Sequence, residues 1–582
     1  MAPVVLSHKA IVVSGLGCSL LALLLQLAVP RLIRLTIDQG VVPAVAGTGR
    51  PRPLANFLWL LGVVAVGRFA VGFVARYNLQ RTSLAIEYDL RNILYRRFLS
   101  LSFSYFDRVQ SGQLISRANS DIRSVQMFLA FAPTLAISLI TFLAAFALMA
   151  ATSLPLAVVA VSCLPGVYLS GARMRAKLFP VSWIVASRQA EVATVVEENA
   201  SGMRVVKSFA AEESQLRLLA RAAQRLRWGS TLQIDIRARY SPYLHNLPRV
   251  GLALVLLYGG RLVIDGQVTI GTLIEFNAYV VMLQGPFMML GFLLMLAQRA
   301  AASAGRIFEI VDEQPEIVER PGAVDLVDGR GDVRFAGVSF GYHGTGTILD
   351  GLDLHLRPGE TVALVGRTGS GKSTVARLIP RFYDAREGAV LIDGHDVRDL
   401  TLASLRSQTG LVLDEPFLFS DTIRNNIAYG QPDAADAAIL EASRAAGVSE
   451  FVDRLPAGYD TVIGERGYTL SGGQRQRIAI ARTLLVNPRI LILDDATRAI
   501  DVQVEHEIHG ALRTLMEDRT TLVIAHRLST IALADRVAFL QNGRITAEGT
   551  HEELMATVPA YPEVLARAGD EPRPAQPTAG RS

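Results

Sequence analysis

Six apolar runs of membrane-spanning length crowd the first 300 residues of this 582-residue chain, and none follows them. They cover about residues 11–29, 55–74, 127–149, 155–169, 250–264 and 272–296. An apolar run of roughly 20 residues can cross a bilayer as a helix, and six in one half make buried helices of a soluble protein a poor alternative. The first run could be a signal peptide behind Lys9, but no A-x-A-like cleavage site follows it. We therefore expect an all-α region of six transmembrane helices in a lipid bilayer.

The placement of arginine between these runs predicts the orientation of the chain. The interval 76–123 carries eight basic residues and the interval 173–239 carries twelve, whereas the loop 151–154 carries none. Because cytoplasmic loops are enriched in Lys and Arg, both long intervals should lie inside, together with both termini. Each interval reads as continuous helix, so we expect helices that extend from the membrane into the cytoplasm. These features predict a multi-pass protein of the cytoplasmic (inner) membrane.

The basic pI of about 9.2 has the same origin and is no evidence for nucleic acid. The formal net charge is only +5, and the arginines gather in the two long intervals, where they set topology. We therefore expect no nucleic-acid partner. Only four of the 58 basic residues are lysines, so a lysine at a functional position is a distinctive choice: Lys9, Lys177, Lys207 and Lys372. With two cysteines, Cys18 and Cys163, a disulfide scaffold is excluded.

After about residue 313 the composition changes, and short strand-like runs replace the long apolar ones. Residues 313–332 contain Pro315, Pro321 and several glycines and acids, which is typical of a linker. Beyond it, β-branched runs at 333–340, 361–365, 389–392, 490–493, 521–524 and 537–540 alternate with helical stretches. This alternation predicts an α/β domain with a largely parallel sheet. We expect a membrane domain at 1–312, a linker at 313–332, the α/β domain at 333–568 and a disordered, Pro-rich tail at 569–582.

The α/β domain contains a phosphate-binding motif between the strand at 361–365 and an apolar-periodic helix. The sequence fits GxxxxGK[ST] in the strand–loop–helix setting that this motif requires. Its glycines let backbone N–H groups wrap phosphates, the helix N-terminus adds a favourable dipole, and Lys372 supplies a compact charge that arginine would not replace. A chance Gly-rich turn is the alternative. We expect this loop to bind a nucleotide, with Ser373 on Mg²⁺, through Gly366, Arg367, Thr368, Gly369, Ser370, Gly371, Lys372, Ser373 and Thr374.

Two further segments indicate the same chemistry. The strand at 490–493 ends in Asp494, where a P-loop NTPase holds Mg²⁺; a helix N-cap is the alternative role of this residue. Just before a helix expected to start near Arg475 lies a second surface suited to phosphate, made of a hydroxyl, glycine amides and a helix N-terminus. One chain has no use for two such surfaces on one γ-phosphate, whereas two chains arranged head to tail do. The second surface consists of Leu470, Ser471, Gly472, Gly473 and Gln474.

The order of four motifs resembles that in the nucleotide-binding domain of an ATP-binding cassette (ABC) protein. These motifs are the P-loop, the LSGGQ run at 470–474, the strand carboxylate and the run AHR at 525–527. The six spans resemble the exporter-fold half-transporters of that superfamily, as do YFDRVQSGQLISR at 105–117 and ENASGMRVVKSF at 198–209. The resemblance implies two protomers that enclose two ATP molecules, each site combining one P-loop with the other chain's LSGGQ. It implies that Tyr342 stacks on adenine, although on spacing alone Tyr342 could be a strand residue. It also implies that His526 contacts the γ-phosphate and that segments near 104–112 and 210–215 transmit dimer closure to the membrane helices.

The chain departs from the family pattern on the P-loop side of this site. The run DDATRAID at 494–501 stands where DEATSALD is expected, so Asp495 replaces the catalytic glutamate and loses about 1.5 Å of reach. Misplacing a catalytic group by that much costs on the order of 100-fold in rate. Asp414 stands where the family has glutamine; it could ligate Mg²⁺ but cannot donate a hydrogen bond as an amide does. Arg498 replaces a serine in the segment that crosses the dimer interface, which also contains Asp501.

Because the departures leave LSGGQ intact, they predict a division of labour between unequal chains. This chain's P-loop would bind ATP and hydrolyse it slowly, while its LSGGQ completes the competent site of a second half-transporter. Ordinary drift with activity retained, or a homodimer, is the alternative. We expect ATP-driven transport of a hydrophobic or amphipathic substrate (drug or lipid-like) by alternating access; the other classes are an ATP-gated channel and a regulatory ATP-binding subunit. Arg68, inside the second run, would favour an acidic amphiphile if it faces the cavity, and the direction of transport stays open.

Overall fold

The chain divides into two compact units, and the division does not follow the sequence order strictly. Unit 1 comprises Met1–Leu99 and Ser111–Glu313, and unit 2 comprises Ser100–Gln110 and Gln314–Ser582. The structure is a computed structural model that describes residues 6–46, 54–327, 329–464, 467, 469–495, 510–525 and 527–570, apart from the side chains at 44, 46, 286–291, 294 and 566–570. A short segment from the first half of the sequence, 100–110, therefore packs with the second half.

Unit 1 is built from long helices. They are α2 (Lys9–Thr36), α3 (Val42–Ala46), α4 (Leu54–Ser100), α6 (Ser111–Ser116), α7 (Ile122–Thr152), α8 (Leu154–Val161), α9 (Leu164–Ser201), α10 (Met203–Ser208), α11 (Glu212–Ile264) and α12 (Ile270–Asp312), with the π-helical turns η1 (Ile37–Val41) and η2 (Arg117–Asp121). Every predicted apolar run lies within these helices, except that the fourth is divided between α8 and α9, with residues 162–163 between them. By length and composition, five of the searched helical stretches could cross a membrane, and the sixth run lies in α12, whose side chains are described only in part.

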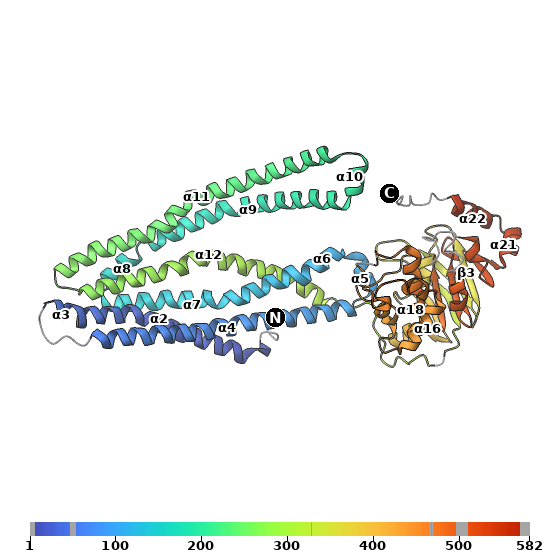
Figure 1. Cartoon of the computed structure of the whole chain (residues 1–582), viewed down its shortest axis with the longest axis horizontal. Helices are drawn as coiled ribbons and strands as arrows, with labels where there is room; N and C mark the ends of the chain where they lie inside the picture. The colour runs from blue at the N-terminus through green and yellow to red at the C-terminus, as the bar shows by residue number, and fades with distance from the viewer. Residues whose placement is uncertain are drawn as a thin grey trace. The chain divides into compact units, whose positions relative to one another are not determined.

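The two long intervals between the spans are helical but interrupted, which corrects the expectation of continuous helices. α4 extends over 47 residues, about 70 Å, and ends before Ser102, whose extended backbone precedes α5 (Phe103–Arg108). In the second interval, α10 separates α9 from α11, and Ala210 has a left-handed φ of +48° through which a right-handed helix cannot continue. Figure 1 shows α9 and α11 running side by side, with α10 where they meet.

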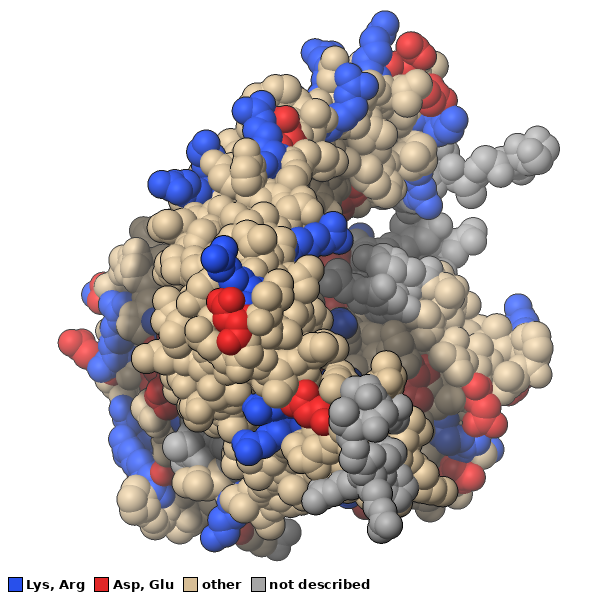
Figure 2. Space-filling view, turned by 90° about the vertical axis from the view of Figure 1, so that its left-hand side faces the viewer, with Lys and Arg blue, Asp and Glu red and all other residues tan. Residues whose placement is uncertain are grey.

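The surface of unit 1 is apolar where the sequence predicts contact with lipid. No residue in the most apolar window of α4 is buried. The exposed side chains of this helix include Leu58, Trp59, Val63, Val66, Phe69 and Phe73. Seen from the end where α3 and α8 lie, uncharged residues make up most of the nearer surface, and several Lys, Arg, Asp and Glu side chains interrupt it (Figure 2). Exposed apolar surface of this extent marks a membrane or partner contact, and together with the spanning helices it identifies a multi-pass membrane protein.

A buried polar cluster joins the end of α2 to the beginning of α12. Arg34 donates from Nη1 to Oε2 of Glu275 at 3.2 Å, although Glu275 is only 3% exposed. Asp38, in η1, accepts from the hydroxyl of Thr269 at 2.6 Å and from the backbone N–H of Gly271 at 3.0 Å. Because Thr269 is the N-cap of α12, the Asp38 carboxylate lies at the positive end of the α12 dipole, which stabilises it there.

We expect Gly271→Ala to disrupt this junction. A Cβ at Gly271 would lie 2.5 Å from Oδ1 of Asp38 and 2.7 Å from the backbone oxygen of Arg34. Overpacking of this kind costs about 1–3 kcal/mol, so the purified protein should unfold at a lower temperature. Gly305→Ala is the matched control, because the added Cβ would meet nothing within 4 Å in the same helix and alanine favours helix. Equal melting temperatures for the two variants would contradict the prediction.

A second carboxylate binds the opposite end of α12. Asp121, the last residue of η2, is 6% exposed and accepts from Nε of Arg306 at 2.9 Å on Oδ2 and from Nη2 of Arg306 on Oδ1. The hydroxyl of Ser303 donates to the same Oδ1 at 2.8 Å. This two-pronged contact fixes both the distance and the angle between η2 and α12, because arginine presents its donors in a planar fork.

Unit 2 contains two sheets, which corrects the expectation of one largely parallel sheet. The first is antiparallel, in the order β2 (Leu349–Leu356), β1 (Val333–Phe340), β4 (Glu387–Ile392), β5 (His395–Asp396). The second has the order β10 (Arg544–Gly549), β9 (Arg536–Gln541), β3 (Thr361–Gly366), β8 (Thr520–Ile524), β7 (Ile490–Asp494), β6 (Thr409–Leu413). All its described pairs are parallel except β10–β9. Two predicted strands, β1 and β4, thus belong to the antiparallel sheet.

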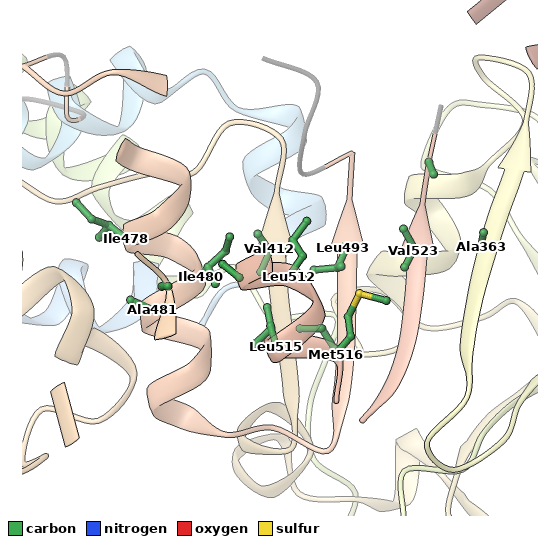
Figure 3. Close-up of a cluster of buried hydrophobic side chains, with 14 of the residues drawn as sticks. Ala363, Val412, Ile478, Ile480, Ala481, Leu493, Leu512, Leu515, Met516 and Val523 are labelled. Atoms are coloured by element: carbon green, nitrogen blue, oxygen red, sulfur yellow. The ribbon is translucent and has the colours of Figure 1, made fainter. Parts of the chain in front are cut away.

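The parallel sheet is buried on both faces. Along β3, Ala363 and Val365 belong to one apolar cluster, whereas Val362 and Leu364 belong to another, as expected for the two-residue period of a strand. Figure 3 shows the first cluster, where α18 and the helical segment 510–516 cover β6, β7, β8 and β3. The helices of this unit are α5, α13 (Lys372–Leu378), α14 (Leu402–Ser407), α15 (Ile423–Ile427), α16 (Asp436–Ala445), α17 (Ser449–Val452), α18 (Gly472–Val486), α20 (Leu528–Ile531), α21 (His551–Thr557) and α22 (Ala560–Asp570).

Candidate nucleotide site

The P-loop connects the central strand β3 to α13, as the sequence predicts. The residues Arg367, Thr368 and Gly369 are exposed, so this part of the loop is accessible to a ligand. Gly371 has φ +106°, a conformation that side chains disfavour, and a Cβ there would lie 2.8 Å from Cδ2 of Leu349. The loop conformation therefore requires glycine at this position. The backbone N–H groups that open α13 lie directly after it, at a site suited to an anion.

Lys372 is held against its own loop. Its Nζ donates to the backbone oxygen of Gly366 at 2.8 Å and to that of Arg367 at 3.0 Å, and the residue is only 6% exposed. Burial of a charged ammonium is costly unless its donors are satisfied, and the two carbonyl groups supply part of that compensation. The lysine charge is thus fixed beside the backbone amides of the P-loop, where phosphates are expected.

Ser373 and Asp494 are brought together from positions far apart in the sequence. The Ser373 hydroxyl donates to Oδ1 of Asp494 at 3.3 Å. Magnesium prefers oxygen ligands and is usually held by one or two carboxylates together with substrate phosphates and water. The hydroxyl of Ser373 and the carboxylate of Asp494 are oxygen ligands of the kind that the ion takes. Among the described residues no group of three or more His, Cys, Asp or Glu could hold a metal by itself. Asp414 follows Leu413, which is in register with Asp494, so all three acids at 414, 494 and 495 lie at one edge of the sheet.

Asp495 has an unusual backbone conformation. Its φ is +53°, and its N–H donates to the backbone oxygen of Ile524 at 3.1 Å, which ties it to the end of β8. Residues other than glycine rarely adopt a left-handed φ, and aspartate is among the few that tolerate it. The carboxylate directly after the strand aspartate is therefore held on a backbone whose geometry suits aspartate better than glutamate.

The LSGGQ run forms the beginning of α18 rather than preceding it, which corrects the expected helix start near Arg475. Ser471 is the N-cap of α18, and its side chain accepts from the backbone N–H of Gln474 at 3.3 Å. The Gln474 side chain accepts in return from the N–H of Ser471 at 2.9 Å, which completes a capping box. Ser471 is exposed, and its hydroxyl hydrogen can still donate while the oxygen accepts. Leu470 and Gly472 are half-buried and Gly473 is buried.

Tyr342 lies directly after β1 and is half-buried. The rings of Phe340 and Tyr383 approach it at 5.0 and 5.1 Å between centroids, both nearly perpendicular to it. Its hydroxyl lies 3.4 Å from that of Thr374 in the P-loop and accepts from Arg377 at 3.4 Å. Within the described part of the chain, no other aromatic ring stacks in parallel on Tyr342. Parallel stacking is the arrangement that an adenine ring would take on it.

Some predicted site residues lie outside the described residues, and one residue near the site was not predicted from the sequence. His526, Arg498, Asp501 and the polar tail from residue 571 belong to the first group. Tyr383 belongs to the second: its hydroxyl donates to Asp107, 276 residues away. No spacing rule links residues at that separation. The only local signal was the aromatic pair Phe382–Tyr383 near the end of a motif-bearing helix.

Each of the two units contains a region that matches a known protein family. Residues 12–287 match the family described as the ABC transporter transmembrane region, and residues 349–498 match the family described as ABC transporter. The chain is 29% identical to a bacterial Atm1-family ABC exporter solved with ATP bound, with a TM-score of 0.79 over 97% of this chain and 100% of the other.

Curated relatives match over most of the chain. A multidrug efflux ATP-binding/permease protein of Mycobacterium bovis is 39% identical over 97% of this chain. The chain spans only 47% of that protein, about half its length. An ATP-dependent lipid A-core flippase of Syntrophus aciditrophicus is 42% identical over 80% of this chain and 78% of its own length. The chain, a helical membrane region fused to an α/β nucleotide-binding region, belongs to the ABC transporter family.

Proposed function

We propose that this chain is one half of an ATP-driven transporter and that its P-loop binds ATP together with Mg²⁺. Support comes from the geometry at the carboxyl end of β3, where Lys372, the Ser373–Asp494 pair and the amides of α13 converge. The ion would neutralise phosphate charge, while Ser373 and Asp494 hold it. Hydrolysis at this edge of the sheet would drive alternating access in the helical unit. The domain bounds and the cytoplasmic placement of both termini remain predictions of the sequence.

Two chains are needed to complete each ATP site. Ser471 is exposed at the start of α18, as a group that meets a partner's nucleotide must be. The Mycobacterium bovis relative is about twice as long as this chain, the length that two such halves joined together would have. We infer that this chain pairs with a second half-transporter, and that the pair encloses two nucleotides.

The proposed difference in hydrolysis rate between the two ATP sites rests on Asp495. The aspartate side chain is one methylene, about 1.5 Å, shorter than the glutamate of the family pattern, and the φ of +53° at Asp495 favours aspartate over the longer residue. Asp414 adds negative charge at the same edge instead of an amide donor. We therefore propose a heterodimer in which this P-loop site hydrolyses ATP slowly and the partner's site, completed by Ser471, turns over.

The proposed substrate is hydrophobic or amphipathic. Relatives are named for multidrug efflux and for lipid A-core flipping, and apolar surface dominates the helices of unit 1. Arg68 is exposed on α4 within the apolar second run. An arginine at such a position favours an anionic headgroup if it lines the transport path.

The test is ATP hydrolysis by the purified full-length chain, alone and with the half-transporter that co-purifies with it from native membranes. Because the competent site needs the partner's P-loop, we expect little turnover by the chain alone and strong turnover by the pair. Asp495→Asn should change the activity of the pair less than twofold. Robust turnover by the chain alone, abolished by Asp495→Asn, would overturn the proposal of unequal sites.

A further inference from the structure

The short helix α5 is anchored in unit 2, although the chain on both sides of it belongs to unit 1. The ring of Phe103 packs on that of Phe382 with 4.4 Å between centroids. The guanidinium of Arg406 lies 5.5 Å from the centre of the same Phe382 ring. The hydroxyl of Ser102 accepts from the backbone N–H of Ile317 at 2.9 Å. Ring packing and the hydrogen bond of Ser102 thus hold α5 in place, while the cation–π contact fixes the Phe382 ring on which Phe103 packs.

One polar contact differs in kind from this packing. The hydroxyl of Tyr383 donates to Oδ2 of Asp107 at 2.5 Å, and Tyr383 is only 7% exposed. Burial, reinforced by the Asp107 carboxylate, holds the pKa of Tyr383 well above its usual range, so the phenol stays protonated and can donate. Hydrogen bonds to a charged acceptor are short and directional. The angle of α5 therefore depends on where the Tyr383 ring lies.

The other side of Tyr383 contacts the proposed adenine platform. Its ring approaches that of Tyr342 edge to face, with 5.1 Å between centroids and 87° between planes. The Tyr342 hydroxyl lies 3.4 Å from that of Thr374, in the P-loop helix α13. A continuous path of three side chains thus runs from the nucleotide end of β1 to α5: Tyr342, Tyr383 and Asp107.

We propose that Tyr383 is a positioning residue through which occupancy of this chain's own P-loop site by the adenine ring sets the position of α5. A base stacked on Tyr342 fixes the plane of that ring, the perpendicular Tyr383 must follow, and Asp107 moves with its hydrogen bond. This path requires binding and not hydrolysis, so a site that turns over slowly can still act on the membrane helices. The inference rests on the proposed binding of ATP at this P-loop.

The packing around α5 makes the inference testable, because removing the Tyr383 hydroxyl leaves the Phe103–Phe382 contact intact. The experiment is amide hydrogen exchange on the full-length assembly in lipid nanodiscs. Residues 103–108 and 366–374 are followed with Mg-ATP, with Mg-tripolyphosphate, which lacks the base, and without either. In the unmodified protein both compounds should slow exchange at 366–374. Only ATP should slow it at 103–108, by up to about fivefold, the upper limit that the ordering of one hydrogen bond of about 1 kcal/mol sets.

Tyr383→Phe should abolish the ATP effect at 103–108 and change the affinity for ATP less than threefold. Asp107→Leu should do the same, and the double variant should add nothing, since both remove one hydrogen bond. Tyr561→Phe is the matched control: it removes a buried hydroxyl that lies 2.9 Å from Nδ1 of His551 in the same unit, away from α5. A merely structural role for Tyr383 would not distinguish ATP from tripolyphosphate.

Three outcomes overturn the inference: an ATP effect at 103–108 that survives Tyr383→Phe, an equal effect of tripolyphosphate, or loss of the effect in Tyr561→Phe as well. Failure of the proposed function looks different. In that case ATP leaves exchange at 366–374 unchanged in the unmodified protein, and the P-loop itself does not bind the nucleotide.

Discussion

Ser471→Ala is expected to lower ATP turnover by the assembled transporter on the order of 100-fold, the effect of removing one positioned donor from a transition state. Ser471 is exposed at the N-terminus of a 15-residue helix, and its hydroxyl can donate to a partner's γ-phosphate. If the partner's site is the competent one, this substitution removes a group from the only site that turns over. Steady-state ATP hydrolysis of the pair measures the effect.

The same substitution also removes a helix cap, so its control must lose a cap as well. Thr550 caps α21 in the same way, through a capping box with Glu553. Thr550→Ala and Ser471→Ala should each lower stability by about 1 kcal/mol, and the two melting temperatures should fall together. Only Ser471→Ala should lower hydrolysis. Comparable loss of hydrolysis in both variants would mean that folding, not chemistry, was affected.

Asp495→Glu is expected to raise ATP hydrolysis at this chain's own P-loop site, on the order of 100-fold. The added methylene restores about 1.5 Å of reach toward the attacking water. The gain competes with a cost, because a residue other than Gly, Asn or Asp pays about 1–2 kcal/mol for the left-handed conformation that Asp495 adopts at φ +53°. We therefore expect a slightly lower melting temperature together with the higher rate.

To isolate this site, hydrolysis is measured in a pair whose partner P-loop lysine has been replaced, so that only the Asp495 site can turn over. Asp495→Asn is the companion variant; it matches the size of aspartate and carries no charge, and it should stay at the background rate. If Asp495→Glu stays there too, the slow site has another cause, for which Asp414 is the nearest candidate.

The sequence predicted the elements whose residues carry their own pattern. The strands β1, β3, β7, β8 and β9 are short, largely apolar runs and were expected close to their actual bounds. β2 was missed because LDGLDLHL places two aspartates and a glycine in the strand. The separation into two sheets was missed because pairing of β1 with β2 and β4 depends on register between distant segments, which no local run encodes.

The same distinction between local patterns and long-range contacts applies to the candidate nucleotide site. The P-loop is contiguous, so its residue types and spacing alone specify a phosphate cradle, and Asp494 follows a strand that the sequence reveals. The helix α18 begins three residues before the expected start near Arg475. Sequence patterns place Gly472 and Gly473 in a loop, whereas the capping box at Ser471 starts the helix before them. The Tyr383–Asp107 hydrogen bond joins segments 276 residues apart. Only the packed structure brings such partners together.

The two π-helical turns of unit 1 have a shared property: each carries a carboxylate that binds α12. Asp38 lies in η1 and holds the first turn of α12, and Asp121 ends η2 and holds Arg306 near the other end. A π turn holds one residue more than the α turn it replaces, so each is a point at which the chain has taken up an extra residue. That residue rotates the following helix by roughly 100°. Because both ends of α12 are held, a rotation of this helix about its own axis would break at least one of the two carboxylate contacts, so its orientation is coupled to that of η1 and η2.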